Sequence, residues 1–346
     1  ITISLLPRSA RFVRPVHERK VGVTAVGVRN GRAGYLVRVN TTWTLIANPV
    51  AGRGRNERAA SDCAARLRLS GRDVTVRFTE RRGHGAQLAA EAVSAGHGAV
   101  IVCGGDGTIA EVLPSLAHTS TALGLIPQGT GNDLARGLGI PRSPAAAVRL
   151  LRDGQARSID LGRCGERWFS TVATFGFDAE VSQIMEEGRA PLSGTAGYLL
   201  ASLRHMHHYR PPHVRLSGDF SESDQSVFLA AVANTRTYGG GLRIAPEASP
   251  DDGLFDVCIV DGTVSMSTLL SLMPRIFWGG HIHHPAVRVV RTQWVRFEPL
   301  DGQHLLHADG EPLAMAPATL RIEAQALRVI QPTVPSPVTT YHEPQT

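Results

Sequence analysis

Hydrophobic and polar residues follow two different patterns along the chain, and the first occupies its N-terminal half. Short apolar, β-branched runs, typical of buried strands, lie at residues 43–47, 74–79, 99–103 and 122–126. Stretches with apolar residues at helical spacing lie at residues 56–69, 86–95, 109–116 and 144–151. This alternation predicts an α/β fold, a doubly wound parallel sheet with helices on both faces and ligands at the carboxyl ends of its strands.

The second pattern begins after residue 154. Runs of strand composition lie between turn signals at residues 168–175, 214–216, 227–233, 255–260, 287–290, 294–297 and 320–330. Helices are expected there only near residues 194–207 and 266–277. We therefore predict a second, β-rich and mostly antiparallel C-terminal domain. The expected division is a basic, disordered extension (1–40), an α/β domain (41–155), a β-rich domain (156–331) and a flexible tail (332–346).

Composition narrows the class of protein. Of the 346 residues, 42% are hydrophobic and 19% are charged, and no apolar run reaches the roughly 18 residues that cross a bilayer, so a transmembrane protein is excluded. The four cysteines lie far apart, without the spacing of a zinc site or a disulfide framework. This cysteine usage favours a reducing, cytoplasmic location.

The net charge of +6 belongs to the start of the chain. Residues 1–40 contain eight basic residues and one acidic residue, whereas the rest contains 28 basic and 29 acidic residues. Because the body is nearly neutral, we expect no nucleic-acid partner, and the extension offers only weak attraction to a membrane surface. Lys20 is the only lysine. Enzymes with a Schiff-base or P-loop lysine are therefore excluded, and arginine must neutralise any bound phosphate.

Three glycine-bearing loops follow predicted strands, at residues 48–55, 104–108 and 127–135. Such a loop before a helix presents free backbone N–H groups that suit a phosphate, and the first loop adds Arg53 and Arg55. Taken alone, the first loop is just as often a solvated connection between a strand and a helix. In a doubly wound sheet, however, the three meet at one edge, and together they predict a phosphate or nucleotide site.

The second loop, Gly-Gly-Asp-Gly-Thr, has three glycines in four residues, which allows a ligand to approach the backbone closely. Asp106 is suited to hold Mg²⁺ through water or to orient a ribose. We expect Thr108 to cap the following helix and face a phosphate. The alternative is a tight strand-to-helix turn in which the aspartate only caps the helix.

Two acidic turns lie in the C-terminal half. Residues 249–254 contain carboxylates flanked by carbonyls, which suits Mg²⁺ or Ca²⁺, although the residues by themselves favour a plain Asp-Asp-Gly hairpin without a metal. In Asp309-Gly310-Glu311 the two acids are two residues apart, so in an extended chain both carboxylates face one side. That arrangement suits phosphoryl transfer, in which a carboxylate accepts the hydroxyl proton, or else a polar β-turn.

Taken in order, these motifs resemble those of the lipid kinase family that includes soluble bacterial diacylglycerol kinases and, more distantly, sphingosine and ceramide kinases. The resemblance spans residues 43 to about 330 and includes the three loops, three glycines at 239–241, the DDGLFDV stretch at 251–257 and Asp309-Gly310-Glu311. A GGDG loop alone would also fit NAD kinases and phosphofructokinases. The GTGND and DDGLFDV stretches point to the lipid kinases.

The resemblance implies that the α/β domain binds ATP and the β-rich domain binds lipid. It assigns ATP binding to Asn48, Pro49, Val50, Ala51, Gly52, Arg53, Thr79, Gly104, Gly105, Asp106, Gly107, Thr108, Ile109, Ala110 and Thr130. It also implies that a Mg²⁺ ion takes the main-chain oxygens of Ser249 and Leu254 with the Asp252 carboxylate. Arg53 stands where relatives often carry lysine, which keeps the charge but replaces an ammonium with a forked guanidinium.

The function that this resemblance implies is ATP-dependent transfer of a phosphoryl group to the hydroxyl of diacylglycerol, giving phosphatidate. Glu311 is the expected proton acceptor, and Asp309 would orient the hydroxyl or a water-bound metal. The substrate implies a cytoplasmic protein in peripheral contact with the inner face of the membrane, and a homodimer stays open. The alternatives are kinases of a sphingoid base, ceramide or another lipid alcohol, and a non-catalytic nucleotide or lipid-binding protein on the same fold.

Overall fold

The computed structural model describes residues 23–29, 32–37, 42–49, 56–189 and 194–333. The chain divides into two compact units, residues 1–41 and 42–346. In the first unit, β1 (Val23–Arg29) and β2 (Arg32–Val37) form an antiparallel pair. We expected no element before residue 43, because basic residues surround this valine-rich run of strand composition.

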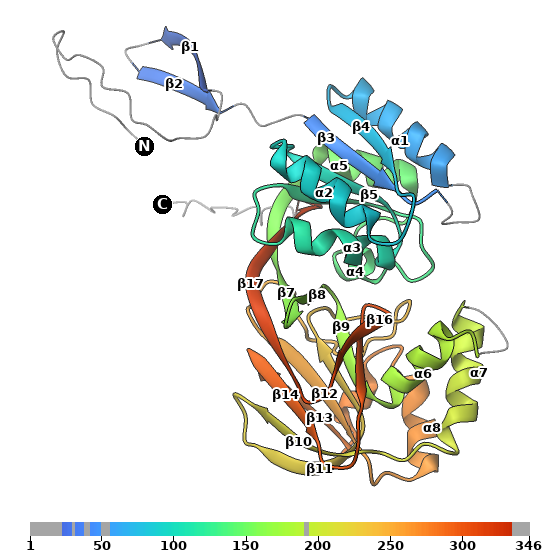
Figure 1. Cartoon of the computed structure of the whole chain (residues 1–346). Coiled ribbons are helices and arrows are strands. Elements are labelled where there is room, and N and C mark those ends of the chain that lie inside the picture. Colours follow the sequence, from blue (N-terminus) through green and yellow to red (C-terminus); the bar gives the residue numbers. More distant parts are fainter. Residues whose placement is uncertain (1–22, 30–31, 38–41, 50–55, 190–193, 334–346) are drawn as a thin grey trace, which may run out of the picture. The chain divides into compact units, whose positions relative to one another are not determined.

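The N-terminal half of the second unit is a parallel sheet in the order β4-β3-β5-β6 (Figure 1). Its strands are β3 (Thr42–Ala47), β4 (Asp73–Phe78), β5 (Ala99–Gly104) and β6 (Ala122–Pro127). Its helices are α1 (Asn56–Leu69), α2 (His84–Ser94), α3 (Asp106–Leu116), α4 (Asp133–Gly137) and α5 (Pro144–Asp153).

Alternate side chains of β5 show why this half is doubly wound. Ile101 and Cys103 pack in the hydrophobic cluster that contains α1 and α5. Val100 and Val102 point the other way, into the cluster that contains α2 and α3. Because both faces of β5 are covered, the whole strand is buried and reads in the sequence as a continuous apolar run. The predicted doubly wound sheet is confirmed.

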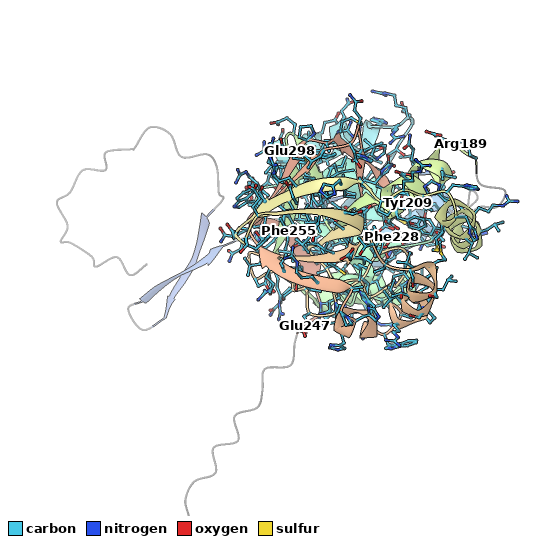
Figure 2. The ribbon with its side chains drawn as sticks, turned by 90° about the horizontal axis from the view of Figure 1, so that it is seen from below. Arg189, Tyr209, Phe228, Glu247, Phe255 and Glu298 are labelled. Atoms are coloured by element: carbon cyan, nitrogen blue, oxygen red, sulfur yellow. The ribbon has the colours of Figure 1, made fainter. Side chains whose placement is uncertain are left out.

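The C-terminal half is a mostly antiparallel β-sandwich, as predicted. Its strands are β7 (Gln155–Cys164), β8 (Arg167–Phe169), β9 (Val172–Gly176), β10 (His213–Gly218), β11 (Ser223–Ala233), β12 (Phe255–Asp261), β13 (Val287–Thr292), β14 (Trp294–Pro299), β15 (Leu305–Ala308), β16 (Glu311–Met315) and β17 (Ala318–Gln331). Between its layers Phe169 stacks on Phe255, with ring centroids 5.7 Å apart, and Phe175 stacks on Phe297 at 5.0 Å. Figure 2 shows Phe255 among the ribbons of the sandwich.

Three helices cover the outer face of this sandwich, α6 (Phe177–Glu186), α7 (Gly194–Met206) and α8 (Met266–Arg275). The expectation of helices only near residues 194–207 and 266–277 is therefore wrong for α6. Its apolar residues Phe177, Val181 and Ile184 have helical spacing, but they continue directly from the apolar run of β9, which hid them. Among the described residues, no helix combines the length and the apolar composition needed to cross a membrane.

Two long strands connect the halves. The 14-residue β17 pairs with β14 in the sandwich, antiparallel with β7 along its length, and parallel with β6 at its end. The expected domain boundary after residue 155 falls at the start of β7. A bulge interrupts β17 at Gln325, whose φ is 51° and whose N–H donates to Asp160 Oδ1 at 2.7 Å. The fully buried Asp160 also accepts from Gly253 N–H at 2.7 Å, so one carboxylate joins the bulge to the turn at residues 249–254.

Candidate active site

The carboxyl ends of the parallel strands lie at one edge of the sheet, where the sequence placed the nucleotide loops. The Thr79 N–H donates to the Ala47 carbonyl at 3.0 Å, which joins the ends of β4 and β3. Asn56, only 1% exposed at the start of α1, donates its side-chain N–H groups to the carbonyls of Asn48 and Cys103, both at 3.0 Å. This amide fixes the β3 loop against β5. The other predicted residues of that loop lie outside the described residues: Val50, Ala51, Gly52 and Arg53.

The second and third loops touch backbone to backbone. A Cβ on Gly105 would lie 2.9 Å from the Gly129 Cα, and one on Gly129 would lie 2.6 Å from the Gly105 Cα. Asn132, with φ 52°, holds the third loop closed, since its Oδ1 accepts from the Gly129 N–H at 2.9 Å and its Nδ2 donates to the Gly129 carbonyl at 2.7 Å. Thr130 lies at the tip of this closed loop. Any side chain at position 105 or 129 would push the two loops apart.

The start of α3 corrects the expected role of Thr108. The helix begins at Asp106, with Gly105 in extended conformation before it, so Thr108 lies in the first turn and does not cap the helix. Its side chain instead faces Gly104, where a Cβ would lie 2.9 Å from Thr108 Oγ1. The helix starts three residues before the expected residue 109, because the Gly105 carbonyl accepts the first helical hydrogen bonds, from the N–H groups of Thr108 and Ile109. The remaining predicted residues of this loop also belong to α3: Gly107 and Ala110.

Asp106 and Asp133 form a close pair of acids at the junction of these loops. The Asp133 N–H donates to Asp106 Oδ1 at 2.8 Å, and both carboxylates crowd Gly131. Burial raises the pKa of Asp106 to about 6, with further contributions from the charges of Asp133 and Asp309. Burial also raises the pKa of Asp133, although the Gly240 N–H, at 2.9 Å, partly opposes it. The site therefore concentrates negative charge that the described protein atoms only partly balance.

Asp309 is held by four donors. Its Oδ2 accepts from the N–H of Ser170 at 2.7 Å and from its Oγ at 2.9 Å. Its Oδ1 accepts from the N–H of Thr171 at 2.9 Å and from the Thr171 hydroxyl. These bonds connect the β15–β16 turn to the segment between β8 and β9. Because each of its oxygens already accepts two hydrogen bonds, the Asp309 carboxylate is fixed in position.

Glu311 lies across the site from Asp309 and faces the N-terminal half. Its carboxylate pairs with the Arg82 guanidinium, and its Oε1 would lie 3.8 Å from a Cβ on Gly107 in the glycine-rich loop. The expectation that the two carboxylates face one side of an extended chain is wrong. Asp309 has φ 52° and Gly310 has φ 81°, so the chain turns there and directs the two acids to different partners.

Glu111 of α3 fixes the loop that carries Arg82. The two carboxylate oxygens of Glu111 accept from the N–H groups of Gly83 and Gly85, each at 2.9 Å. At the start of α2 these backbone N–H groups have no carbonyl partner within the helix, so a carboxylate is favoured there. The sequence analysis missed both Arg82 and Glu111. Glu111 lies three residues after Thr108, so its position in the first turns of α3 was the available signal.

A second contact joins the halves at α4. The Gly240 N–H donates to Asp133, and Gly241 lies against Arg136, whose guanidinium carbon would be 3.6 Å from a Cβ on that glycine. Gly239, Gly240 and Gly241 all have positive φ, which explains the run of three glycines in the sequence. The glycine run of the C-terminal half is therefore a docking point for the GTGND loop.

The turn at residues 249–254, predicted to hold a metal, is satisfied by protein groups. Asp252 Oδ1 accepts from the Leu254 N–H at 3.1 Å, and Oδ2 pairs with the Arg291 guanidinium. The Ser249 hydroxyl donates to Asp251 at 2.7 Å. In the part of the chain that the structure describes, no group of three or more His, Cys, Asp or Glu side chains is arranged to hold a metal ion.

Comparisons with known proteins match both halves. Residues 42–164 match the diacylglycerol kinase catalytic domain, and residues 171–331 match the YegS C-terminal NAD kinase beta sandwich-like domain. A protein of Mycobacterium tuberculosis (strain CDC 1551 / Oshkosh) named diacylglycerol kinase is 39% identical over 297 residues, which cover 84% of this chain and 94% of that protein. The chain belongs to the diacylglycerol kinase family of lipid kinases.

Other relatives of this lipid kinase carry a broader name. A Pseudomonas aeruginosa protein named as a candidate YegS-like lipid kinase is 34% identical over 279 residues, covering 80% of this chain and 90% of that protein. A solved structure from Bacillus anthracis str. Sterne, named as a candidate diacylglycerol kinase, matches with a TM-score of 0.72 and 23% identity, covering 84% of this chain and 97% of that one. That likeness confirms the two-part fold.

Proposed function

We propose that this lipid kinase transfers the γ-phosphoryl group of ATP to the primary hydroxyl of a diacylglycerol, producing phosphatidate and ADP. The observation that supports this best is the position of Glu311. It belongs to the sandwich, yet its carboxylate lies beside Gly107 of the glycine-rich loop in the α/β half. A group so placed could meet a lipid hydroxyl on one side and a nucleotide phosphate on the other.

In the proposed reaction Glu311 accepts the hydroxyl proton while the hydroxyl oxygen forms a bond to the γ-phosphorus. The bond from that phosphorus to the β–γ bridging oxygen breaks, and ADP leaves with the electron pair. Phosphoryl transfer needs mainly alignment and charge neutralisation from the protein. Asp309, with four hydrogen bonds, serves as a positioning residue that fixes the turn carrying Glu311.

The ATP phosphates would lie on the loops at the carboxyl edge of the parallel sheet. There the described part of the first loop, Thr79, the residues from Gly104 to Ala110, and Thr130 offer backbone N–H and hydroxyl groups. Positive charge would come from Arg53 and also from Arg82, which extends from the α2 loop to Glu311. Arg82 is the addition that the structure makes to the expected phosphate site.

Mg²⁺ would be held best near Asp106 and Asp133. The two carboxylates lie together against Gly131, and burial raises the pKa of both. A hard divalent cation with oxygen ligands would offset this negative charge. When bound, the ion supplies charge neutralisation for the phosphates. At the turn formed by Ser249, Asp252 and Leu254, an ion would first have to displace Arg291 from the Asp252 carboxylate. That second position stays a prediction.

A second candidate substrate is another lipid alcohol, such as a sphingoid base or ceramide. The relatives named YegS-like lipid kinase, without a stated lipid, favour keeping this candidate. Either substrate resides in a membrane, which would bring a cytoplasmic enzyme into peripheral contact with the inner face of the bilayer.

The deciding experiment is transfer of radiolabel from γ-labelled ATP to a panel of lipid alcohols in mixed micelles. We expect labelled phosphatidate from diacylglycerol, and none with the Glu311→Gln variant. Preferential labelling of ceramide or a sphingoid base would select the second candidate. Labelling of no lipid by the folded wild-type protein, with and without Mg²⁺, would contradict the proposed function.

A further inference from the structure

Helix α8 has apolar residues on both of its faces. Leu269 and Leu272 point inward and are buried in the cluster that α6 and α7 share. Leu270 points outward with 47% of its surface exposed, and Phe277 and Trp278, in the turns that continue the helix, are each 63% exposed. These three exposed side chains, one on α8 and two adjacent aromatic residues in the turns directly after it, are called the aromatic patch (Leu270, Phe277 and Trp278).

The surroundings of the aromatic patch are basic. From residue 262 to residue 297 the chain contains no aspartate or glutamate. Exposed Arg275 lies within the patch sequence, and the exposed Arg243 lies beside it, since its N–H donates to the Ile276 carbonyl at 2.9 Å. Glu247 is an exposed acidic side chain near the patch, because the adjacent Pro246 lies against Gly279. Figure 2 shows Glu247 at the edge of the molecule.

A short path of contacts connects the aromatic patch to the candidate active site. Arg243, which bonds to Ile276, lies three residues after Gly240, and the Gly240 N–H donates to Asp133 in the GTGND loop. The Asp133 N–H in turn donates to Asp106 Oδ1 at 2.8 Å. A surface that contacts the patch therefore lies close to the segment on which the two halves dock.

We infer that the aromatic patch docks this protein on an anionic lipid bilayer. The inference rests on the proposed function, which requires a substrate drawn from a membrane. Exposed Trp and Phe side chains on an amphipathic helix enter the boundary between headgroups and acyl chains, and adjacent arginines are attracted to anionic headgroups. The apolar side chains and the positive rim together match that one partner.

The test is flotation of the full chain with phosphatidylcholine vesicles, with and without phosphatidylglycerol, in the absence of ATP. The variant is Phe277→Ser combined with Trp278→Ser. Its matched control is Leu69→Ser, because Leu69 is 89% exposed at the end of α1, and α1 and α8 lie at opposite ends of the second unit (Figure 1). We expect the double variant to bind anionic vesicles at least about tenfold more weakly, and the control to bind as the wild type does.

A second variant separates insertion from folding. Trp278→Phe should still float with anionic vesicles but should lose the blue shift of tryptophan emission, since the other tryptophans, Trp43, Trp168 and Trp294, are buried or half-buried. Unchanged circular dichroism melting of all variants would show that they fold.

Two results would overturn the inference. The first is equal vesicle binding by the wild type and the folded double variant. The second is a change only in oligomeric state, measured by analytical ultracentrifugation, which would assign the patch to a second copy of this chain. Turnover of a short-chain diacylglycerol in micelles is measured in parallel: its absence from the wild type contradicts the proposed function, whereas the flotation result stands by itself.

Discussion

The two acidic turns of the C-terminal half look alike in the sequence but differ in what they face. In the turn at residues 249–254, Asp252 bonds to its own turn and to Arg291, and Asp160 ties that turn to β17. In the turn between β15 and β16, Asp309 is equally well satisfied, but Glu311 extends to Arg82 and Gly107 in the other half of the unit.

The difference shows how to separate a structural carboxylate from a chemical one. A carboxylate whose oxygens are saturated by fixed donors of its own fold holds that fold in place. A partly exposed carboxylate whose partner is an exposed arginine from the other half can exchange that partner for a substrate. By this criterion Asp160, Asp252 and Asp309 are structural or positioning groups, and Glu311 is the candidate base.

The largest effect is expected from Glu311→Gln. The amide keeps the size of the side chain but removes its basicity, so kcat should fall by about 10² to 10⁴ while the KM for ATP changes little. The measurement is steady-state kinetics in mixed micelles. Glu166→Gln, an equally conservative change at an exposed residue of the sandwich, is the control and should leave kcat unchanged. Retention of most activity by Glu311→Gln would assign the base elsewhere.

Asp309→Asn should come next, and it should affect both stability and catalysis. The amide cannot accept four hydrogen bonds, so unfolding free energy should fall by about 1–3 kcal/mol, and kcat should fall because Glu311 loses its fixed position. Combined with Glu311→Gln, the loss in kcat should be much smaller than the product of the two single losses. If Asp309→Asn abolished activity and Glu311→Gln did not, the two roles would be reversed.

The ion pair between Arg82 and Glu311 gives a further test of the difference between the two turns. Arg82→Ala removes this ion pair and a positive charge from the proposed phosphate site, so we expect a higher KM for ATP and a lower kcat, measured by steady-state kinetics. The neighbouring Arg81→Ala is the control.

At the first loop, Arg53→Ala should raise the KM for ATP and lower kcat, and Arg53→Lys should be milder. Near-wild-type kinetics for both Arg53 variants would remove this residue from the site.

The buried carboxyl group of Asp106 should produce a pH dependence of stability. Burial raises the pKa of Asp106 to about 6, so the folded state favours the protonated acid. The resulting stability is fully present below the unfolded pKa of about 4 and is lost as the pH rises through the folded value. Asp106→Asn should therefore gain up to about 3 kcal/mol over the wild type near pH 7.5, and nothing near pH 4.

Thermal melting from pH 4 to 8 provides the measurement, with the exposed Asp62→Asn as the control. Mg²⁺ should stabilise the wild type at pH 7.5 and should have little effect on Asp106→Asn. A wild-type melting temperature that did not respond to Mg²⁺ would remove the ion from this position.

The smallest effect is expected at the other turn. Asp252→Asn keeps the hydrogen bond from Leu254 and loses only a partly exposed ion pair with Arg291, so we expect a loss of about 1 kcal/mol or less and nearly unchanged kcat. Melting curves with and without Mg²⁺ check this result. If the Mg²⁺ response disappeared in Asp252→Asn and persisted in Asp106→Asn, the second turn would be the metal site.

The sequence by itself determined the architecture and most of the elements. Apolar runs and helical spacing located β3 to β6 and α1 within a few residues, because a parallel strand covered on both faces must be continuously apolar. The glycine loops were also recognisable, since only a close approach of backbones, such as that between Gly105 and Gly129, makes so many glycines favourable. These signals are local in the chain.

Only the tertiary structure decided how the acids are used. The pairing of Arg82 with Glu311 joins residues 229 positions apart, and no periodicity in the sequence encodes it. The left-handed conformation of Asp309 reversed the expected direction of its side chain relative to Glu311. Asp160 acquired its role from a bulge in β17, 165 residues away. Hydrogen bonding and charge depend on distances in space, and folding sets those distances.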